Sequence, residues 1–130
     1  MYREIAKAAI KARENSYSPY SEFKVGAALI TEDGIIFTGC NIESASYTPT
    51  ICAERVAASK AVSEGYRNIE AIAIAGSSEE TFPCGVCRQF LWEFGDMDIV
   101  IVKSADDYEV YKLSELLPHS FGPEDLKENE

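Results

Sequence analysis

Two short cysteine-bearing segments constrain this chain more than any other feature: C-A-E at residues 52–54 and P-C-G-V-C at residues 83–87. Each opens a run rich in helix-forming residues, and Gly65 and Gly95 follow as glycines that can end a helix in the left-handed conformation. Both segments come after β-rich runs, so both fall at predicted strand-to-helix junctions. Ligands of α/β proteins gather at such junctions, where helix N-termini point free N–H groups.

The rest of the chain alternates between helical and extended patterns and contains no internal repeat. Apolar residues at helical spacing predict an amphipathic helix over residues 2–14. Two β-rich runs, 23–31 and 34–42, are separated by E-D-G, which predicts an antiparallel hairpin. Further strands are predicted at 69–76 and 98–103. Because strands that alternate with helices favour parallel pairing, we expect a three-layer α/β/α fold with a mixed sheet.

Length and composition fit a single domain over residues 1–130. The chain is 46% hydrophobic and 26% charged, which is ordinary for a globular fold of this size. No stretch reaches the ~18 to 20 apolar residues of a membrane span, and the charged N-terminal segment has no apolar signal core. We therefore expect a cytoplasmic protein with no membrane partner. The acidic segment 122–130 is expected to be a solvated C-terminal tail.

The net charge argues against binding to a nucleic acid. Twelve basic and twenty-two acidic residues give a formal charge of -10. Such a field repels a phosphate backbone, and the basic residues form no run that could act as a local positive patch. We therefore expect no nucleic-acid partner.

Three of the four cysteines have the spacing of metal ligands. Cys84 and Cys87 lie three residues apart on one predicted helix, so their sulfurs can face one point. Cys52 and Glu54 would lie about 200° apart around a regular helix, at ~100° per residue. Cys52 must therefore sit at the helix cap, with non-helical backbone, if its sulfur and the Glu54 side chain are to approach one ion.

Four cysteines in a chain expected in the cytoplasm favour metal binding or reactive thiols over disulfides. The alternative is burial as small hydrophobic residues, which we expect only of Cys40, inside an apolar strand. His119 is the only histidine and is expected to be an ordinary loop residue. Three thiolates leave the fourth tetrahedral position of zinc open, as in catalytic sites. The pattern thus predicts one catalytic zinc ion per chain.

The spacing C-x-E, then 28 residues, then P-C-x-x-C resembles the known signature of zinc deaminases, in which His or Cys is the first ligand and the glutamate is not a ligand. Five ordered motifs extend the resemblance over nearly the whole chain to the small cytidine deaminases: YSPYSEFKVGAAL, GCNIESASY, ICAERVA, PCGVCRQ and ELLPHSFGPEDL. That family has a mixed five-stranded sheet, is homotetrameric, and converts cytidine and deoxycytidine to the corresponding uridines in pyrimidine salvage. The resemblance implies the same fold, activity and assembly here.

The resemblance also implies roles for single residues. Cys52, Cys84 and Cys87 match the zinc ligands, and Glu54 matches the residue that transfers protons. The implied substrate contacts are Phe23 against the base, the backbone N–H of Ala53 to the pyrimidine carbonyl, Asn41 and Glu43 on the ribose 3′-hydroxyl, and Tyr47 and Phe121 at a neighbouring subunit's site.

Each side-chain contact to the substrate has a simpler alternative. Phe23 could fill the core, as aromatic residues in strands usually do. Asn41 and Glu43 could form a solvated strand edge, although their i,i+2 spacing would place both on one face of a strand. Tyr47 and Phe121 could merely cover a core.

The chemistry of deamination explains these residue types. Zinc lowers the pKa of a bound water toward ~7, and Glu54 can then serve as both base and acid while ammonia is released. Three thiolates give the centre a formal charge of -1, which weakens the Lewis acidity of zinc. Arg55 is expected to offset this charge by donating to thiolate sulfurs, and its alternative is a solvated position on the helix surface.

Two other functions fit the sequence less well. A related deaminase could act on another cytosine-like substrate, such as a nucleoside antibiotic. A zinc-stabilised binding module could lack catalysis altogether. Glu54 argues against this second function, because a structural site has no use for an unligated carboxylate beside the metal.

Overall fold

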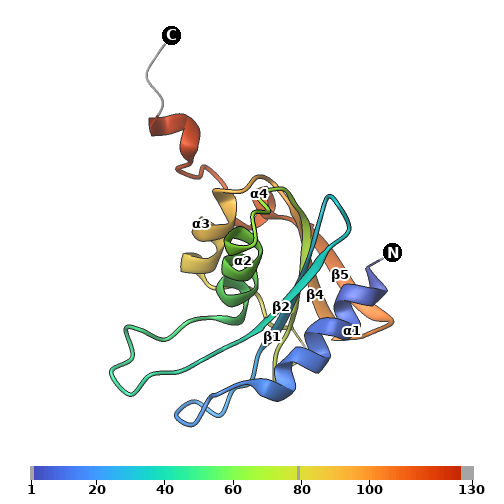
Figure 1. Cartoon of the computed structure of the whole chain (residues 1–130), viewed down its shortest axis with the longest axis vertical. Coiled ribbons are helices and arrows are strands. Elements are labelled where there is room, and N and C mark those ends of the chain that lie inside the picture. The colour runs from blue at the N-terminus through green and yellow to red at the C-terminus, as the bar shows by residue number, and fades with distance from the viewer. Residues whose placement is uncertain (1, 79, 127–130) are drawn as a thin grey trace.

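The computed structural model describes residues 2–78 and 80–126 and contains a five-stranded sheet between helices (Figure 1). The strand order is β2-β1-β3-β4-β5. Along the chain the elements are α1 (Arg3–Ala12), β1 (Gly26–Thr31), β2 (Ile36–Cys40), α2 (Ala53–Ser63), β3 (Ile69–Ala75), α3 (Gly85–Trp92), β4 (Asp98–Ser104), β5 (Asp107–Lys112) and α4 (Leu113–Leu116), with short 3-10 helices at Arg13–Asn15 and Pro123–Leu126.

The sheet is mixed, as predicted. β1 and β2 form the antiparallel hairpin expected from E-D-G, and the N–H of Gly34 donates to the carbonyl of Thr31 at 2.9 Å in its turn. β3 is antiparallel to β1 and parallel to β4, whereas β5 is antiparallel to β4. Since β2 and β3 are both antiparallel to β1, they run in the same direction. α2 connects β2 to β3, and α3 connects β3 to β4, so each helix joins two strands that run in the same direction. Both helices therefore begin at the same end of the sheet.

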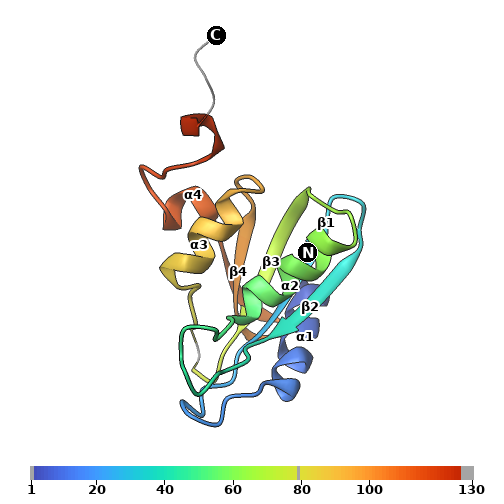
Figure 2. The same cartoon turned by 60° about the vertical axis from the view of Figure 1, so that its left-hand side comes forward.

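Helices lie on both faces of the sheet (Figure 2), and an apolar core fills the space on each face. Neighbouring residues of β1 alternate between the two cores, because successive strand side chains point to opposite faces. Ala28 packs on α1 with Ile5 and Ala9, whereas Leu29 packs on the other side with Ala57 of α2. The layers are thus α1, the sheet, and α2 with α3, which confirms the predicted three-layer architecture.

The strands of the hairpin are shorter than predicted. β1 begins at Gly26 and β2 ends at Cys40, so Phe23, Asn41 and Glu43 lie in the adjoining loops. The prediction that Asn41 and Glu43 lie on a strand is therefore wrong.

The backbone hydrogen bonds between β1 and β2 stop at this point because the side chain of Asn41 takes the place of a backbone carbonyl as acceptor. The N–H of Val25 donates to Oδ1 of Asn41 at 3.0 Å, whereas the N–H of Asn41 still donates to the carbonyl of Val25 at 3.2 Å. Asparagine side chains commonly compete with backbone pairing in this way. Cys40, just before this point, is only partly buried because β2 is an edge strand, so its expected place in the core is also wrong.

The C-terminal part of the chain contains elements whose residue ranges the sequence patterns did not predict. β5 alternates in D-Y-E-V-Y-K, but most of its residues are exposed, as on an edge strand. Of the expected acidic tail, Pro123–Leu126 form a 3-10 helix that projects beyond α3, away from the sheet (Figure 1), and residues 127–130 lie outside the described residues. Among the described residues, no helix has the length and apolar character needed to cross a membrane.

Candidate functional site

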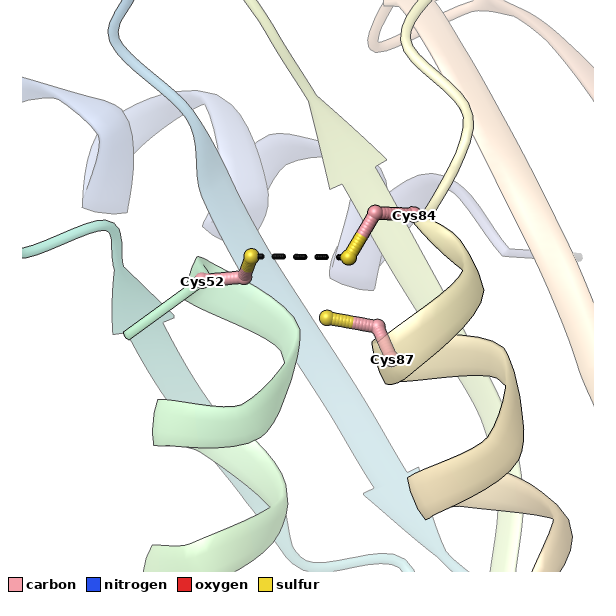
Figure 3. A group of neighbouring side chains, drawn as sticks. All are labelled: Cys52, Cys84 and Cys87. Carbon is pink, nitrogen blue, oxygen red and sulfur yellow. Dashed lines mark hydrogen bonds between the residues drawn. The ribbon is translucent and has the colours of Figure 1, made fainter. Parts of the chain in front are cut away.

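The three cysteines predicted as metal ligands lie together between the starts of α2 and α3, with their sulfurs pointing toward one another (Figure 3). Cys52 and Cys84 are the residues that precede the two helices, and both have the extended backbone expected of a cap, with ψ of 154° and 169°. Cys87 lies in the first turn of α3. The three sulfurs are within 4.8 Å of one another, and those of Cys52 and Cys84 are 3.7 Å apart.

This spacing fits a zinc ion. Two thiolates bound at ~2.3 Å to a tetrahedral zinc ion lie about 3.8 Å apart, whereas the sulfurs of a disulfide are only ~2.05 Å apart. All three thiols are free, and Cys84 is exposed while Cys87 is buried, so the group opens to solvent on one side. Within the described residues, the metal-binding group contains these three thiols alone, and His119 lies exposed in the turn after α4. Three protein ligands are typical of a catalytic zinc site.

Arg55 lies beside the thiol group. Its Nη2 is 3.8 Å from Sγ of Cys52 and 3.5 Å from the carbonyl oxygen of Thr50. The pKa of Cys52 falls to about 5 because the Cys87 thiol donates to its sulfur and the Arg55 guanidinium stabilises the thiolate. The same hydrogen bond, together with burial, raises the pKa of Cys87. Negative charge on the sulfurs is therefore balanced by a neighbouring cation.

Glu54 is the buried carboxyl group of the site. It lies in the first turn of α2 and is only 4% exposed. The pKa of Glu54 is raised to about 7, mainly by burial and to a smaller extent by the negative charge of Cys52, while Arg55 acts in the opposite direction. A carboxyl group with a pKa near neutrality can both accept and release a proton.

A cavity of about 330 Å³ opens beside Cys52 and Cys84 and collects most of the residues predicted to contact a substrate. The predicted residues that line it are Phe23, Asn41, Glu43, Ala53 and Glu54. They come from three separate parts of the chain: the loop before β1, the loop after β2, and the start of α2. The first N–H groups of α2 have no acceptor within the helix, so they remain donors for a ligand.

Asn41 is held rigidly by its side-chain amide. Oδ1 accepts hydrogen bonds from the N–H of Val25 and from the hydroxyl of Ser16, and Nδ2 donates to the carbonyl of Phe23 at 2.8 Å. These bonds use both lone pairs of Oδ1 and one of the two N–H groups of Nδ2. One N–H group therefore remains for a ligand in the cavity.

Glu43 is held from the loop before β1. Its Oε1 accepts from the backbone N–H groups of Tyr20 and Ser21 at 3.0 and 3.1 Å, and Oε2 accepts from the Ser21 hydroxyl. The hydroxyl of Ser21 and these N–H groups lower the pKa of Glu43. The carboxylate thus stays ionised and can accept a further hydrogen bond from a hydroxyl group.

Tyr47 and Phe121 do not line this cavity. Tyr47 is 73% exposed in the loop after β2 and packs edge-on against Tyr20, with ring centroids 6.5 Å apart. Phe121 is 57% exposed near the C-terminus, and its carbonyl accepts a hydrogen bond from Nε2 of Gln89 at 2.8 Å. Both residues are therefore largely exposed on the surface of the chain.

Comparison with protein families decides which chemistry this arrangement serves. Residues 2–103 match the family model of the cytidine and deoxycytidylate deaminase zinc-binding region, a span that contains the three thiols and Glu54. The chain belongs to the cytidine and deoxycytidylate deaminase family. Its predicted class, an enzyme of this deaminase family, is confirmed by the match.

Named deaminases are similar to this chain over nearly its whole length. The cytidine deaminase of Sporosarcina psychrophila is 49% identical over 89% of this chain and 88% of its own length. The probable cytidine deaminase of Dictyostelium discoideum is 48% identical over 97% of this chain and 90% of its own length. The crystal structure of cytidine deaminase from Burkholderia pseudomallei superimposes with a TM-score of 0.88 at 44% identity, covering 93% of this chain and 99% of that one. The predicted deaminase fold is confirmed by this likeness.

Six further residues line the cavity, although the sequence pattern assigned them no contact with a substrate: Ser21, Val25, Thr50, Ile51, Thr81 and Phe82. Phe82 precedes P-C-G-V-C directly, and an aromatic residue this close to a ligand was a signal that could have identified it. Ser21 had no comparable signal, because its hydrogen bond to Glu43 joins residues 22 positions apart.

Proposed function

We propose that the protein catalyses the zinc-dependent hydrolytic deamination of free cytidine and deoxycytidine to uridine and deoxyuridine, with release of ammonia. One observation supports this proposal above all: a single cavity is lined by two of the three clustered thiols, by the buried carboxyl group of Glu54 with its near-neutral pKa, and by polar side chains that can bind a sugar. A purely structural metal site would need neither the carboxyl group nor the cavity.

We propose that Cys52, Cys84 and Cys87 hold one zinc ion per chain. When bound, the ion supplies a Lewis acid that lowers the pKa of water at its open position. Glu54 would take a proton from the water as its oxygen bonds to C4 and deliver that proton to ring N3. Glu54 would then move the proton of the new C4 hydroxyl to the amine, which leaves as ammonia when the C4–N bond breaks. Its pKa of about 7 suits both directions of transfer near neutral pH. Arg55 offsets the negative charge of the thiolates from outside the cavity.

The remaining lining residues bind and orient the nucleoside. The backbone N–H of Ala53, at the positive end of α2, donates to the pyrimidine carbonyl. Phe23 packs against the base. Asn41 offers its free N–H to the ribose 3′-hydroxyl, and Glu43 accepts from the same hydroxyl with its unused lone pair.

The active form is proposed to be a cytoplasmic homotetramer that serves pyrimidine salvage. Tyr47 and Phe121 are exposed and lie outside the cavity of their own chain, as is expected of side chains that complete the site of a neighbour. No nucleic acid or membrane partner is proposed, in keeping with the charge of -10.

The test is to mix the purified protein with cytidine or deoxycytidine, follow ammonia release, and measure metal content in parallel. We expect turnover of both nucleosides, one zinc per chain, loss of activity on chelation, and recovery when zinc is returned. Active protein that contains no zinc would overturn the metal assignment. Zinc-loaded protein that turns over neither nucleoside, but does turn over another cytosine-like compound in a substrate panel, would replace the substrate assignment.

A further inference from the structure

We infer that Phe82, together with Thr81, forms the wall of the site that faces C5 of the pyrimidine and decides which C5 substituents the enzyme accepts. The inference rests on the proposed deamination of cytidine. Both residues line the cavity beside Cys84, and neither belongs to the zinc ligands or to the groups proposed to hold the sugar.

The proposed contacts of a bound cytosine ring fix the orientation of every edge of the ring except the one that contains C5. C4 carries the amine and must face the thiol group. N3 and the carbonyl at C2 face the start of α2, where Glu54 transfers protons and Ala53 offers its N–H. N1 carries the sugar, which extends toward Asn41 and Glu43. C5 and C6 form the remaining edge and face away from α2.

The opposite side of the cavity is formed by the segment that leads into α3. Among the described residues, the lining from this side consists of Thr81, Phe82 and Cys84. Cys84 belongs to the thiol group that C4 faces, and Figure 3 shows that it lies across from Cys52, where the chain enters α3. Since C5 is bonded to C4, a group on C5 must fit beside Cys84. Thr81 and Phe82 are the residues in that position.

This wall is held in place by its neighbours. The ring of Phe82 packs edge-on against Tyr111 of β5, with centroids 5.5 Å apart, and Pro83 directly after it is fully buried. Thr81 packs on the backbone of Gly76 so closely that a Cβ there would lie 1.9 Å from the threonine Oγ1. A wall supported on these sides cannot easily retreat from a bulkier substrate.

The test compares kcat/KM for 5-methylcytidine and cytidine in the wild type and in Phe82→Ala. We expect the ratio of the two values to rise about tenfold in the variant, because one methyl group in an apolar pocket typically changes efficiency ~10 to 200-fold. Dividing the variant's ratio by that of the wild type cancels the intrinsic effect of the methyl group on the chemistry.

Phe90→Ala is the matched control. Phe90 is 36% exposed against 37% for Phe82, and it makes a similar edge contact, at 5.8 Å, with Phe94. It lies on α3 but does not line the cavity. The molecular mass of each variant in solution is measured alongside, so that a change in assembly is detected.

A rise of about threefold or more in Phe82→Ala, absent from Phe90→Ala, would support the inference. A smaller rise, a fall, or an equal rise in both variants would overturn it. If Phe82→Ala does not fold, Phe82→Leu is judged by the same limits, because it retains apolar contact with Tyr111. A wild type that holds zinc but does not deaminate cytidine would instead overturn the proposed function, so the two failures are distinguishable.

Discussion

Glu54 and Arg55 are neighbours in sequence but have different places at the thiol group. Consecutive helix residues point ~100° apart, so one side chain can face the cavity while the other lies behind the ligands. Glu54 lines the cavity, whereas Arg55 does not line it and contacts Cys52. The two residues therefore make separate predictions.

Glu54→Gln should keep the fold and the zinc ion but lose most activity. Glutamine is nearly isosteric with glutamate but cannot accept the proton, and general acid–base catalysis contributes ~10² to 10⁴-fold. Ammonia release and zinc content are the measurements. Glu64→Gln, at the exposed far end of the same helix, is the control and should behave like the wild type. A Glu54→Gln protein that holds zinc and turns over cytidine within about threefold of the wild type would contradict the assigned role.

Arg55→Gln should lower turnover or zinc retention by ~10 to 100-fold, the usual loss when a partner of a metal ligand is removed. Without the cation beside Cys52, more electron density stays on the ion and its Lewis acidity falls. Activity should then require a higher pH, so the acid limb of the pH–rate profile moves upward. Lys60→Gln removes an exposed positive charge from the same helix and should change none of these values. If Arg55→Gln had the pH–rate profile and the zinc content of the wild type, Arg55 would not be the residue that offsets the charge of the thiolates.

At the scale of elements, the position of the site depends on how closely β2 approaches α2. Gly39 lies in β2 directly against the first turn of α2, and a Cβ there would lie 2.6 Å from the carbonyl oxygen of Ala53 and 2.6 Å from the N–H nitrogen of Ala57. Backbone atoms at this distance cannot give way as a flexible side chain can. The absence of a side chain at Gly39 therefore allows the start of α2 to reach its place beside α3.

Gly39→Ala should destabilise the protein by ~1 to 3 kcal/mol, as overpacking typically does, and should also weaken zinc binding because the helix that carries Cys52 must shift. Thermal unfolding and zinc affinity are the measurements. Gly85→Ala is the control, because a Cβ at Gly85 meets nothing within 4 Å, and its melting temperature should stay close to that of the wild type. Equal stability and equal zinc affinity in Gly39→Ala would show that β2 and α2 are not in tight contact.

At the scale of the whole molecule, the net charge is expected to affect which substrates reach the site. The net charge of -10 opposes the approach of phosphates, and the chain has no basic cluster or glycine-rich phosphate loop. Free cytidine should therefore be used more efficiently than cytidine 5′-monophosphate or a single-stranded oligonucleotide. Comparing kcat/KM at two salt concentrations is the measurement, because screening should narrow a gap that is caused by charge. Comparable efficiency on the phosphorylated substrates would contradict this prediction.

The chain should form a homotetramer, with a solution mass about four times its 14.3 kDa. Phe121→Ala should lower turnover while zinc content stays unchanged, whereas Leu126→Ala, also exposed in the C-terminal segment, should not. A fully active monomer would contradict this assembly. Mixing subunits tests the contribution in trans: combining Phe121→Ala with Glu54→Gln subunits should restore activity, because some sites then have both residues intact.

Residue type and spacing alone identified the three cysteines that the structure brings together. The i,i+3 spacing places Cys84 and Cys87 on one side of a helix start, and the angle between positions 52 and 54 required an extended cap, which Cys52 adopts. Helix periodicity, helix-ending glycines and the E-D-G turn likewise located the main elements. These features could be predicted because each depends on interactions within a few residues of the chain.

Only the tertiary structure decided where the strands end and which loops complete the cavity. β1 begins late because Val25 pairs with the side chain of Asn41, 16 residues away. Glu43 is positioned by Ser21, and Phe82 by Tyr111 of a strand that the pattern left unassigned. No local propensity encodes these contacts, since each requires the sheet and its loops to fold before the partners meet.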